Sequence, residues 1–271
     1  MQELKSFIRN LFPRFVYSWY ATLYRKAVAV WFMGNRFECP FCGKHFRKFV
    51  AAGSSQPVWR EKGILGGLRK NVLCPNCHSA DRERMIYIYL RDCTDLLDGT
   101  RSYKVLHIAP ENNLGRVLRE QSHLEYLSGD LNPKRSLNMV RIDITDIQYP
   151  ENSFDVIICS HVLEHVTSDR KAMAELYRVL KPGGWAILQV PLSVTLKETF
   201  EDKSVVIEKD RERVFGQFDH VRIYAKDDYK NRLESVGFNV RVFNLAEELG
   251  EKAVRYAFQK DENLYVCSRS L

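Results

Sequence analysis

Residues 154–190 read FDVIICSHVLEHVTSDRKAMAELYRVLKPGGWAILQV, and this stretch decides the fold. Residues 154–159 form a nearly unbroken apolar run, which is typical of a parallel strand buried on both faces. Apolar residues then recur at helical spacing over residues 170–180, and the helix is expected to stop at Lys-Pro-Gly-Gly, residues 181–184. Residues 185–190 form another apolar run. A strand, a helix and a strand in this order predict one unit of a parallel sheet.

The same alternation extends upstream of this unit. Short apolar runs at residues 105–108, 124–128 and 139–142 predict three more strands, and residues 113–121 predict a helix between the first two. Strand–helix alternation of this kind indicates a doubly wound α/β sheet. Such sheets bind their ligands at the carboxyl ends of the strands.

The front of the chain has a different character. Residues 2–33 predict a helix, with Pro13 placed to break it or to begin its second part. From residue 15 on, apolar and aromatic residues gather on one face and basic residues on the other. This pattern is typical of a helix at a membrane surface, and also of a helix docked on its own protein core.

Basic residues are concentrated in the first part of the chain. The net charge is +7, and residues 1–103 hold 17 Lys and Arg against 8 Asp and Glu, whereas the rest holds 24 against 26. This surplus predicts an anionic partner, either nucleic acid or a membrane surface, with a solvated basic face as the alternative. The longest apolar run, residues 27–33, is far short of the ~20 residues that cross a bilayer. We expect a cytoplasmic protein, with peripheral membrane contact through residues 1–34 as a further expectation.

Four of the seven cysteines form two Cys-x-x-Cys pairs, Cys39 with Cys42 and Cys74 with Cys77. Four thiolates complete a tetrahedral shell for zinc, and a closed shell predicts a structural role for the metal. The alternative is four thiols without metal. The expected organisation is a basic amphipathic helix over residues 1–34, a zinc-ribbon module with a trailing helix over residues 35–98, and the α/β domain over residues 99–271.

Three segments carry a resemblance to class I S-adenosylmethionine-dependent methyltransferases, especially the branch that includes quinone-biosynthesis enzymes. They are YPENSFDVII at residues 149–158, VLEHV at residues 162–166 and YRVLKPGG at residues 177–184. With the zinc pairs in front, the whole chain resembles little-characterised bacterial methyltransferases that have an N-terminal zinc ribbon. The resemblance implies a seven-stranded Rossmann-like sheet whose last strand, at residues 264–267, runs antiparallel. It also implies S-adenosylmethionine as the methyl donor.

The resemblance further assigns residues to the cofactor. Asp130, followed by Leu131, maps to the acidic residue that holds the ribose hydroxyls. Asp143 and Ile144 map to the adenine contacts, with Asp146 as a competing candidate. The alternative for either aspartate is a role as a helix cap or turn former. Ser160 and His161 follow the fourth strand, at the edge of the same pocket.

The loop after the first strand departs from the family pattern. It reads His107-Ile108-Ala109-Pro110-Glu111 and contains no glycine before Gly115. His107 takes the place of an acidic residue, Ala109 and Pro110 are expected to pass close to the cofactor, and Glu111 is expected to pair with its ammonium group. Either the loop binds the same cofactor with altered geometry, or binding has been lost. The other matching positions favour binding.

Methyl transfer needs a general base only when the acceptor must lose a proton. His220, with Asp219 beside it, is the preferred base, and His161 is the rival. Arg222 is expected to bind an anionic acceptor, and residues 192–217 are expected to form a lid over it.

Three functions remain open from the sequence. The first is transfer of a methyl group to a small-molecule, saccharide or lipid-linked acceptor. The second is a nucleic-acid methyltransferase, RNA in particular, that uses the zinc module for binding. Against methylation of DNA base amino groups, Ser160-His161-Val162-Leu163 stands where those enzymes carry Asn/Asp-Pro-Pro-aromatic. The third is a non-catalytic zinc-ribbon protein with a degenerate methyltransferase fold.

Overall fold

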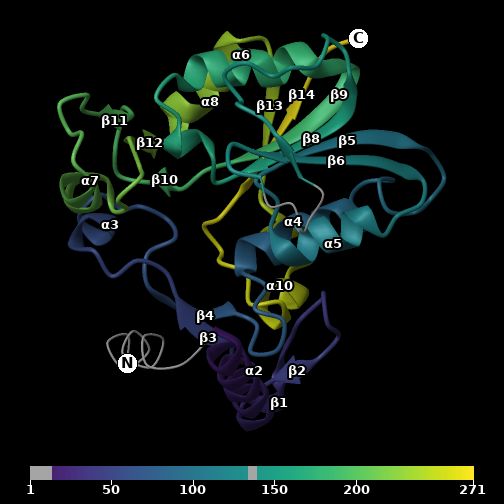
Figure 1. Ribbon diagram of the computed structural model, residues 1–271, viewed down its shortest axis with the longest axis vertical. Coiled ribbons are helices and arrows are strands. Elements are labelled where there is room, and N and C mark those ends of the chain that lie inside the picture. Colours follow the sequence, from purple (N-terminus) through teal and green to yellow (C-terminus); the bar gives the residue numbers. More distant parts are fainter. Residues whose placement is uncertain (1–13, 134–138) are drawn as a thin grey trace.

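The computed structural model describes residues 14–133 and 139–271, with side chains from residue 23 onward. A seven-stranded sheet with the spatial order β13-β14-β9-β8-β5-β6-β7 lies at its centre (Figure 1). The strands are β5 (Tyr103–Ile108), β6 (Leu124–Asp130), β7 (Val140–Arg141), β8 (Phe154–Ser160), β9 (Leu180–Gln189), β13 (Asn239–Phe243) and β14 (Leu264–Ser268). All neighbours pair parallel except β14, which is antiparallel to both β9 and β13. The expected α/β sheet with an antiparallel last strand is confirmed.

Helices cover both faces of this sheet because its strands carry apolar side chains on both sides. On one face lie α6 (Asp169–Val179) and α8 (Lys226–Ser235), and on the other lie α4 (Asp81–Asp92) and α5 (Asn112–Arg119) (Figure 1). Leu106 of β5 packs in the core beneath α6 and α8, and Val105 packs in the core beneath α4 and α5, because successive side chains of a strand point to opposite faces. Each fully buried side chain of this size contributes about 1.5–3 kcal/mol.

The β9 strand begins earlier than its apolar run suggests. It starts at Leu180, which pairs with Phe154, so the Lys-Pro-Gly-Gly segment ends helix α6 and already belongs to the strand. Gly183 has φ +75°, a left-handed conformation that glycine adopts without strain. The register of the ladder shifts between Phe154 and Val156, which accommodates this turn inside the sheet.

The cysteine-bearing segment, residues 33–79, folds as two antiparallel ribbons. One pairs β1 (Met33–Glu38) with β2 (His45–Phe46), and the other pairs β3 (Val50–Ala52) with β4 (Arg69–Leu73). A short helix, α3 (Pro57–Glu61), lies between β3 and β4. Helix α4, which follows the segment directly, packs in the same core as β5 and α5.

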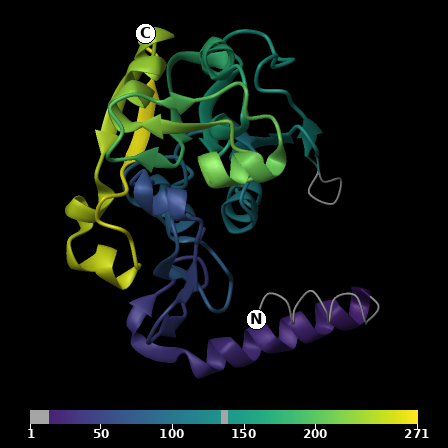
Figure 2. The ribbon, with the colours of Figure 1, turned by 90° about the vertical axis from the view of Figure 1, so that its left-hand side faces the viewer.

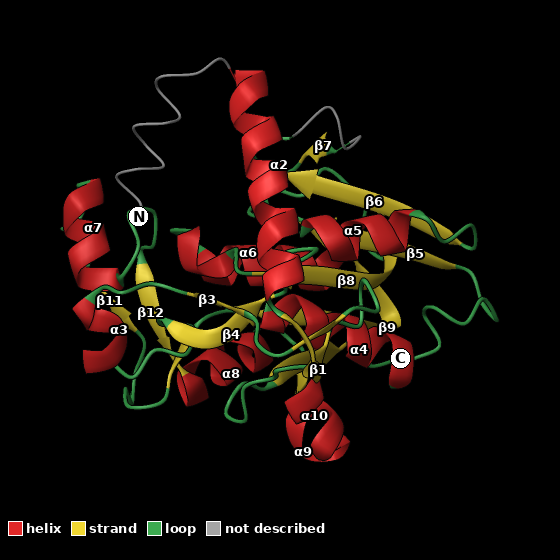
Figure 3. Ribbon diagram, turned by 90° about the horizontal axis from the view of Figure 1, so that it is seen from below, coloured by secondary structure: helices red, strands yellow, loops and turns green. Residues whose placement is uncertain are grey.

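The insertion after β9 forms a small sheet of its own. Strands β10 (Leu192–Ser193), β12 (Arg222–Ala225) and β11 (Phe200–Glu201) pair in that order, and α7 (Glu208–Phe215) precedes β12. Helices α3 and α7 lie side by side at the edge of the molecule (Figures 1 and 3). The segment between the two cysteine pairs therefore reaches the insertion, a contact that the sequence did not predict.

Two short helices precede the last strand, α9 (Leu245–Leu249) and α10 (Glu251–Arg255). Both pack in the core on the side of α4 and α5. A short 3-10 helix, η2 (Leu163–His165), follows β8 directly.

Helix α2 (Arg14–Trp31) projects away from the rest of the molecule (Figure 2). The expected helix over residues 2–33 is too long at its end, because Met33 already begins β1. Residues 2–13, including Pro13, lie outside the described residues. Val30, Trp31 and Met33 are exposed. Within residues 14–133 and 139–271, no helix has the length and apolar character needed to span a membrane.

Candidate active site

The carboxyl ends of β5, β8 and β9 lie next to one another. Ile108 pairs with Cys159, and Ser160 pairs with Gln189. The amide of His161 donates to the Gln189 carbonyl at 2.8 Å. The loop at Ala109 and the turn at His161 therefore share one edge of the sheet, where ligands of doubly wound folds bind.

The glycine-poor loop after β5 adopts the backbone that a glycine would favour. Ala109 has φ +47°, and its amide donates to the Gly129 carbonyl at 2.7 Å. A left-handed alanine is uncommon, and such strained positions cluster at functional sites.

Next to this loop, the buried ring of His107 pairs with the half-buried carboxylate of Glu111. His107 is fully buried, with Nδ1 3.0 Å from the Tyr126 hydroxyl and Nε2 3.2 Å from Glu111 Oε2. Burial opposes ionisation of Glu111, yet the hydrogen bond and charge of His107 hold its pKa below the ordinary value. Glu111 is therefore a fixed carboxylate at the start of α5.

Arg82 reaches this edge from the first turn of α4, five residues beyond Cys77. Its charge acts on Glu111, His161 and Glu262, and its Nε is buried without a hydrogen-bond partner among the described residues. Sequence reasoning missed Arg82. Only the tertiary contact between α4 and the sheet brings it here, so no local signal could have identified it.

The two aspartates assigned to the nucleoside lie at the ends of neighbouring strands. Asp130 ends β6, and its Oδ1 accepts the Asn132 amide at 2.7 Å, while Leu131 beside it is exposed. Asp143 is exposed, and its Oδ1 accepts the amide and the hydroxyl of Thr145, both at 2.8 Å. These two hydrogen bonds lower the pKa of Asp143.

The turn after β7 also fixes the other residues assigned to the adenine. The backbone of Asp143 pairs with that of Asp146 in an isolated bridge, so the two carboxylates belong to one turn. Ile144 is buried in the core on the α6 side rather than displayed on the surface. Asp143 thus combines the turn-forming role with a position beside the site.

Several buried polar atoms at this edge have no partner within the described part of the chain. They are Arg82 Nε, Ser160 Oγ and His161 Nε2. Buried polar atoms are nearly always hydrogen-bonded, so unpartnered ones indicate a missing ligand or water. An amino-acid cofactor with an ammonium and a carboxylate group fits this set, since Glu111 offers an anion and Arg82 a cation.

Three histidines surround the buried carboxylate of Glu164 on η2. Its Oε1 lies 3.2 Å from His161 Nδ1 and 3.9 Å from His165 Nε2, and His165 Nδ1 lies 3.2 Å from Asp219 Oδ2. The ring centroids of His165 and His220 are 4.7 Å apart. Burial opposes ionisation of Glu164, but the interactions with His161 and then the other histidines hold its pKa low.

The two candidate bases both lie in this cluster. Burial lowers the pKa of His220 to about 4 and also lowers the pKa of His161, so both rings are neutral near pH 7. Each keeps a buried Nε2 that has no hydrogen-bond partner in the described structure. The sequence placed these residues in two separate segments, and the structure brings them together.

Arg222 does not face an acceptor. It is 2% exposed, and all three guanidinium nitrogens are used inside the protein. Its partners are the carbonyls of Leu163, Val166 and Thr167 and the carboxylate of Glu201. The expectation that Arg222 binds an anionic acceptor is therefore wrong: it fastens η2 to β12.

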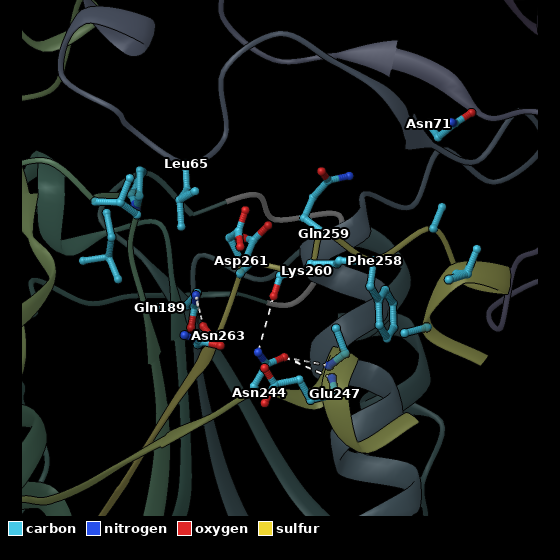
Figure 4. A pocket seen from close by; sticks show the side chains of 18 of the residues that line it. Leu65, Asn71, Gln189, Asn244, Glu247, Phe258, Gln259, Lys260, Asp261 and Asn263 are labelled. Atoms are coloured by element: carbon cyan, nitrogen blue, oxygen red, sulfur yellow. Dashed lines mark hydrogen bonds between the residues drawn. The ribbon is translucent and has the colours of Figure 1, made fainter. Parts of the chain in front are cut away.

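A cavity of about 1220 Å³ opens beside the end of β9 (Figure 4). Gln189 and Asn263 lie at its base, joined by a hydrogen bond of 2.8 Å. Leu65, from the segment between the cysteine pairs, lies on one side, and Phe258 and Glu247 lie on another (Figure 4). The volume suffices for a drug-sized ligand, and its walls mix apolar and polar groups.

The four paired cysteines converge at one point. Cys39 Sγ lies 3.5 Å from Cys77 Sγ, and Cys42 Sγ lies 3.8 Å from Cys74 Sγ. A tetrahedron of sulfurs about 2.3 Å from a zinc ion has edges of about 3.8 Å, so the spacing fits that metal. All four thiols are free of disulfides. The Ser79 hydroxyl lies 3.3 Å from the sulfurs of both Cys39 and Cys77.

The ligand atoms of these four thiols all lie within 4.8 Å of one another, close enough to hold one metal ion. His45 and His78 flank the pairs in sequence and are not members of that group. Gly43 and His78 follow the two pairs at equivalent positions, with φ +63° and +59°. The two Cys-x-x-Cys turns thus have matching backbones, as expected for a site with two similar halves.

Comparison with known proteins assigns the sheet domain to a class. The family described as "Methyltransferase domain" matches residues 98–188. The ubiquinone/menaquinone biosynthesis C-methyltransferase UbiE of Haemophilus ducreyi is 27% identical over 124 residues, which cover 41% of this chain and 48% of that protein. UbiE of Serratia proteamaculans is 29% identical over 123 residues, covering 41% and 49%. The chain thus spans about half the length of the curated relatives it matches.

Solved structures with a similar fold are more distant in sequence. An S-adenosylmethionine-dependent methyltransferase from Mesorhizobium loti has a TM-score of 0.47 and 14% identity, covering 68% of this chain and 98% of that one. The [4+2]-cyclase SpnF has a TM-score of 0.47 and 15% identity, covering 71% and 82%. The strand order and the family match define an α/β methyltransferase fold. The match to the methyltransferase family covers residues 98–188, the part of the chain that holds β5, β6, β7, β8 and most of β9.

Proposed function

We propose that this chain transfers a methyl group from S-adenosylmethionine to a small-molecule, saccharide or lipid-linked acceptor. When bound, S-adenosylmethionine supplies an electrophilic methyl group on a positively charged sulfur. The observation that carries the proposal is the set of unpartnered buried atoms of Arg82, Ser160 and His161 at the carboxyl edge of the sheet. Ser160 and His161 lie within residues 98–188, which match the methyltransferase family, and Arg82 reaches the same edge from α4.

The positions of the charged groups support the proposed contacts with the cofactor. Glu111, held by His107, would pair with the ammonium group of the donor, and Arg82 with its carboxylate. Ala109 and Pro110 would let the backbone pass close to it. Asp130 would hold the ribose hydroxyls and Asp143 would contact the adenine, with Asp146 on the same turn as the alternative.

The histidine cluster serves the acceptor side. The proposed entry for the acceptor is the cavity beside β9, whose wall includes Gln189, the backbone partner of His161, and the proton of the acceptor would pass to the free Nε2 of His161 or His220. Asp219 orients its neighbours in this cluster through His165. Contacts of α7 and β10 with the segment between the cysteine pairs hold the insertion, residues 192–217, in place. In this proposal the insertion covers the acceptor side of the site and excludes water from it.

The four-cysteine group binds one structural zinc in this account. The fit of the sulfur spacing supports it, and so does the position of the group. Cys77 lies close before α4, which carries Arg82 to the cofactor edge. Metal binding therefore stabilises the segment that completes the site.

Residues 1–34 are the proposed point of contact with a membrane surface. The exposed apolar side chains of Val30, Trp31 and Met33 near the end of α2 support this. The test is sedimentation with anionic phospholipid vesicles. Trp31→Asp should reduce the bound fraction severalfold at low salt, and equal binding of the variant and the wild type would exclude this surface.

Label transfer from S-adenosyl-[methyl-³H]methionine tests the function directly. The full chain is incubated with fractionated cell extract, and Asp130→Ala serves as the control for background. Tritium in the lipid or small-molecule fraction, dependent on Asp130, is expected. Tritium in RNA would support the nucleic-acid alternative, and the absence of cofactor binding by folded protein would support the non-catalytic one.

A further inference from the structure

A second group of metal-compatible side chains lies inside the methyltransferase domain. Glu164 and His165 belong to η2, directly after β8, and His220 lies two residues before β12. One ligand atom from each of the three lies within 4.8 Å of the other two. Residues far apart in sequence thus present two imidazoles and one carboxylate to a common point.

Two of the potential ligand atoms lack other partners. Within the described structure no hydrogen bond reaches Oε2 of Glu164 or Nε2 of His220, whereas Oε1 of Glu164 has His161 Nδ1 at 3.2 Å. Glu164 is 1% exposed and His220 is 3% exposed. Burial of an unpartnered carboxylate oxygen and an unpartnered imidazole nitrogen is costly, and a bound cation would remove that cost for both residues at once.

Asp219 contacts the ring nitrogen of His165 that faces away from Glu164. Its Oδ2 lies 3.2 Å from His165 Nδ1, while His165 Nε2 points toward Glu164 at 3.9 Å. Histidines that bind metals commonly donate their other ring nitrogen to a carboxylate, which fixes the tautomer and the ring orientation. Asp219 would thus leave the Nε2 lone pair of His165 free for a metal.

We propose that Glu164, His165 and His220 bind a first-row divalent transition-metal ion, separate from the four-cysteine group. Two imidazoles with one carboxylate suit manganese, iron or zinc, whereas calcium and magnesium prefer oxygen ligands alone. Three protein ligands leave coordination positions open for another molecule.

The role of this ion rests on the proposed methyltransferase function. A cation held by these three residues would polarise a hydroxyl group of the acceptor and make its proton easier to remove. His220 is then a metal ligand, and His161, whose Nδ1 faces Glu164, is the residue that receives the proton on Nε2. This assigns the acceptor to the class of hydroxyl compounds, which become methyl ethers.

Manganese is the probe for the test, because Mn²⁺ gives an electron paramagnetic resonance signal and does not favour a four-thiolate site. The full chain, with its cysteine site loaded with zinc, is titrated with MnCl₂. We expect one bound Mn²⁺ per chain. Glu164→Gln and His220→Ala should weaken binding at least about tenfold, and Asp219→Asn should weaken it about 10–100-fold as an outer-shell change. His123→Ala, a change at a histidine bonded to the Leu96 carbonyl, should leave binding unchanged.

Zinc content and circular dichroism show whether each variant is folded, and His220→Gln replaces His220→Ala if the latter is not. No Mn²⁺ bound by folded wild-type protein, or equal binding by folded Glu164→Gln, would overturn the proposal. Calorimetry with S-adenosylhomocysteine is run in parallel. Binding of Mn²⁺ without binding of S-adenosylhomocysteine would support the metal site and contradict the proposed methyltransferase function. Binding of S-adenosylhomocysteine without binding of Mn²⁺ would reject the metal site alone.

Discussion

Ala109 and His161 both have a left-handed backbone, with φ +47° and +56°, at the carboxyl ends of the neighbouring strands β5 and β8. A non-glycine residue in this region costs roughly 1–2 kcal/mol. Two residues with this backbone therefore follow neighbouring strands at the same edge of the sheet. The surrounding sheet holds this strain where the account places the cofactor.

Substitutions at Ala109 should separate strain from packing. Ala109→Gly relieves the left-handed conformation and should change the free energy of unfolding by less than about 1 kcal/mol. Ala109→Val places a β-branched side chain in the same conformation and should cost more than about 2 kcal/mol. Urea unfolding measures both values. Equal losses for the two variants would mean that the backbone at Ala109 is not left-handed.

Removal of one thiol should release the proposed zinc. Cys74→Ser deletes one of four ligands, so metal analysis should show less than one zinc per chain, and protease should cut the segment between the cysteine pairs faster. Cys93→Ser is the matched control, because Cys93 is exposed and outside the group. Zinc-free wild-type protein, purified without chelator, would be incompatible with this part of the account.

The lid should depend on the contact between Trp59 and Gly216. Trp59 Nε1 donates to the Gly216 carbonyl at 3.1 Å, and a Cβ added at Gly216 would lie 2.3 Å from that nitrogen. Gly216→Ala should therefore detach α7 from α3 and lower the free energy of unfolding by about 1–3 kcal/mol. Gly250→Ala is the control, since Gly250 has φ +54° but nothing within 4 Å of the added atom. Similar losses at both glycines would attribute the effect to backbone strain alone.

Histidine substitutions should affect turnover more than cofactor binding. His161→Ala and His220→Ala should each lower the methylation rate by about 10²–10⁴-fold, with the affinity for S-adenosylhomocysteine nearly unchanged. Rates are measured with the acceptor identified by label transfer. A variant that loses stability but keeps its rate would show that the histidine only braces the lid.

The centre of the sheet was predictable because β5, β8 and β14 are short, mostly apolar segments that can be recognised locally, whereas β13, with Asn239 and Arg241 among its five residues, was not predicted. Residues 154–159 and 264–267 predicted β8 and β14 nearly to their bounds. The start of β9 at Leu180 was not predictable in the same way, since its pairing with Phe154 overrides the turn signal of Lys-Pro-Gly-Gly.

The site was predictable only where a resemblance supplied positions. His161, Asp219 and His220 were named from their segments, but their meeting around Glu164 depends on packing between η2 and the loop before β12. Arg82 and Trp59 had no local signal at all. Their positions follow from contacts across the whole chain, which the order of residues does not show.

Calorimetric titration of the full chain with S-adenosylhomocysteine tests the central claim most directly. The account predicts one site per chain in the wild type, and binding at least about tenfold weaker in Asp130→Ala, which loses hydrogen bonds to the ribose. Asp98→Ala is the control, because Asp98 holds a similar turn at Thr100 away from the site. This variant should bind S-adenosylhomocysteine as tightly as the wild type does. No heat of binding from folded, zinc-loaded wild-type protein would contradict the claim that this chain is an S-adenosylmethionine-dependent methyltransferase.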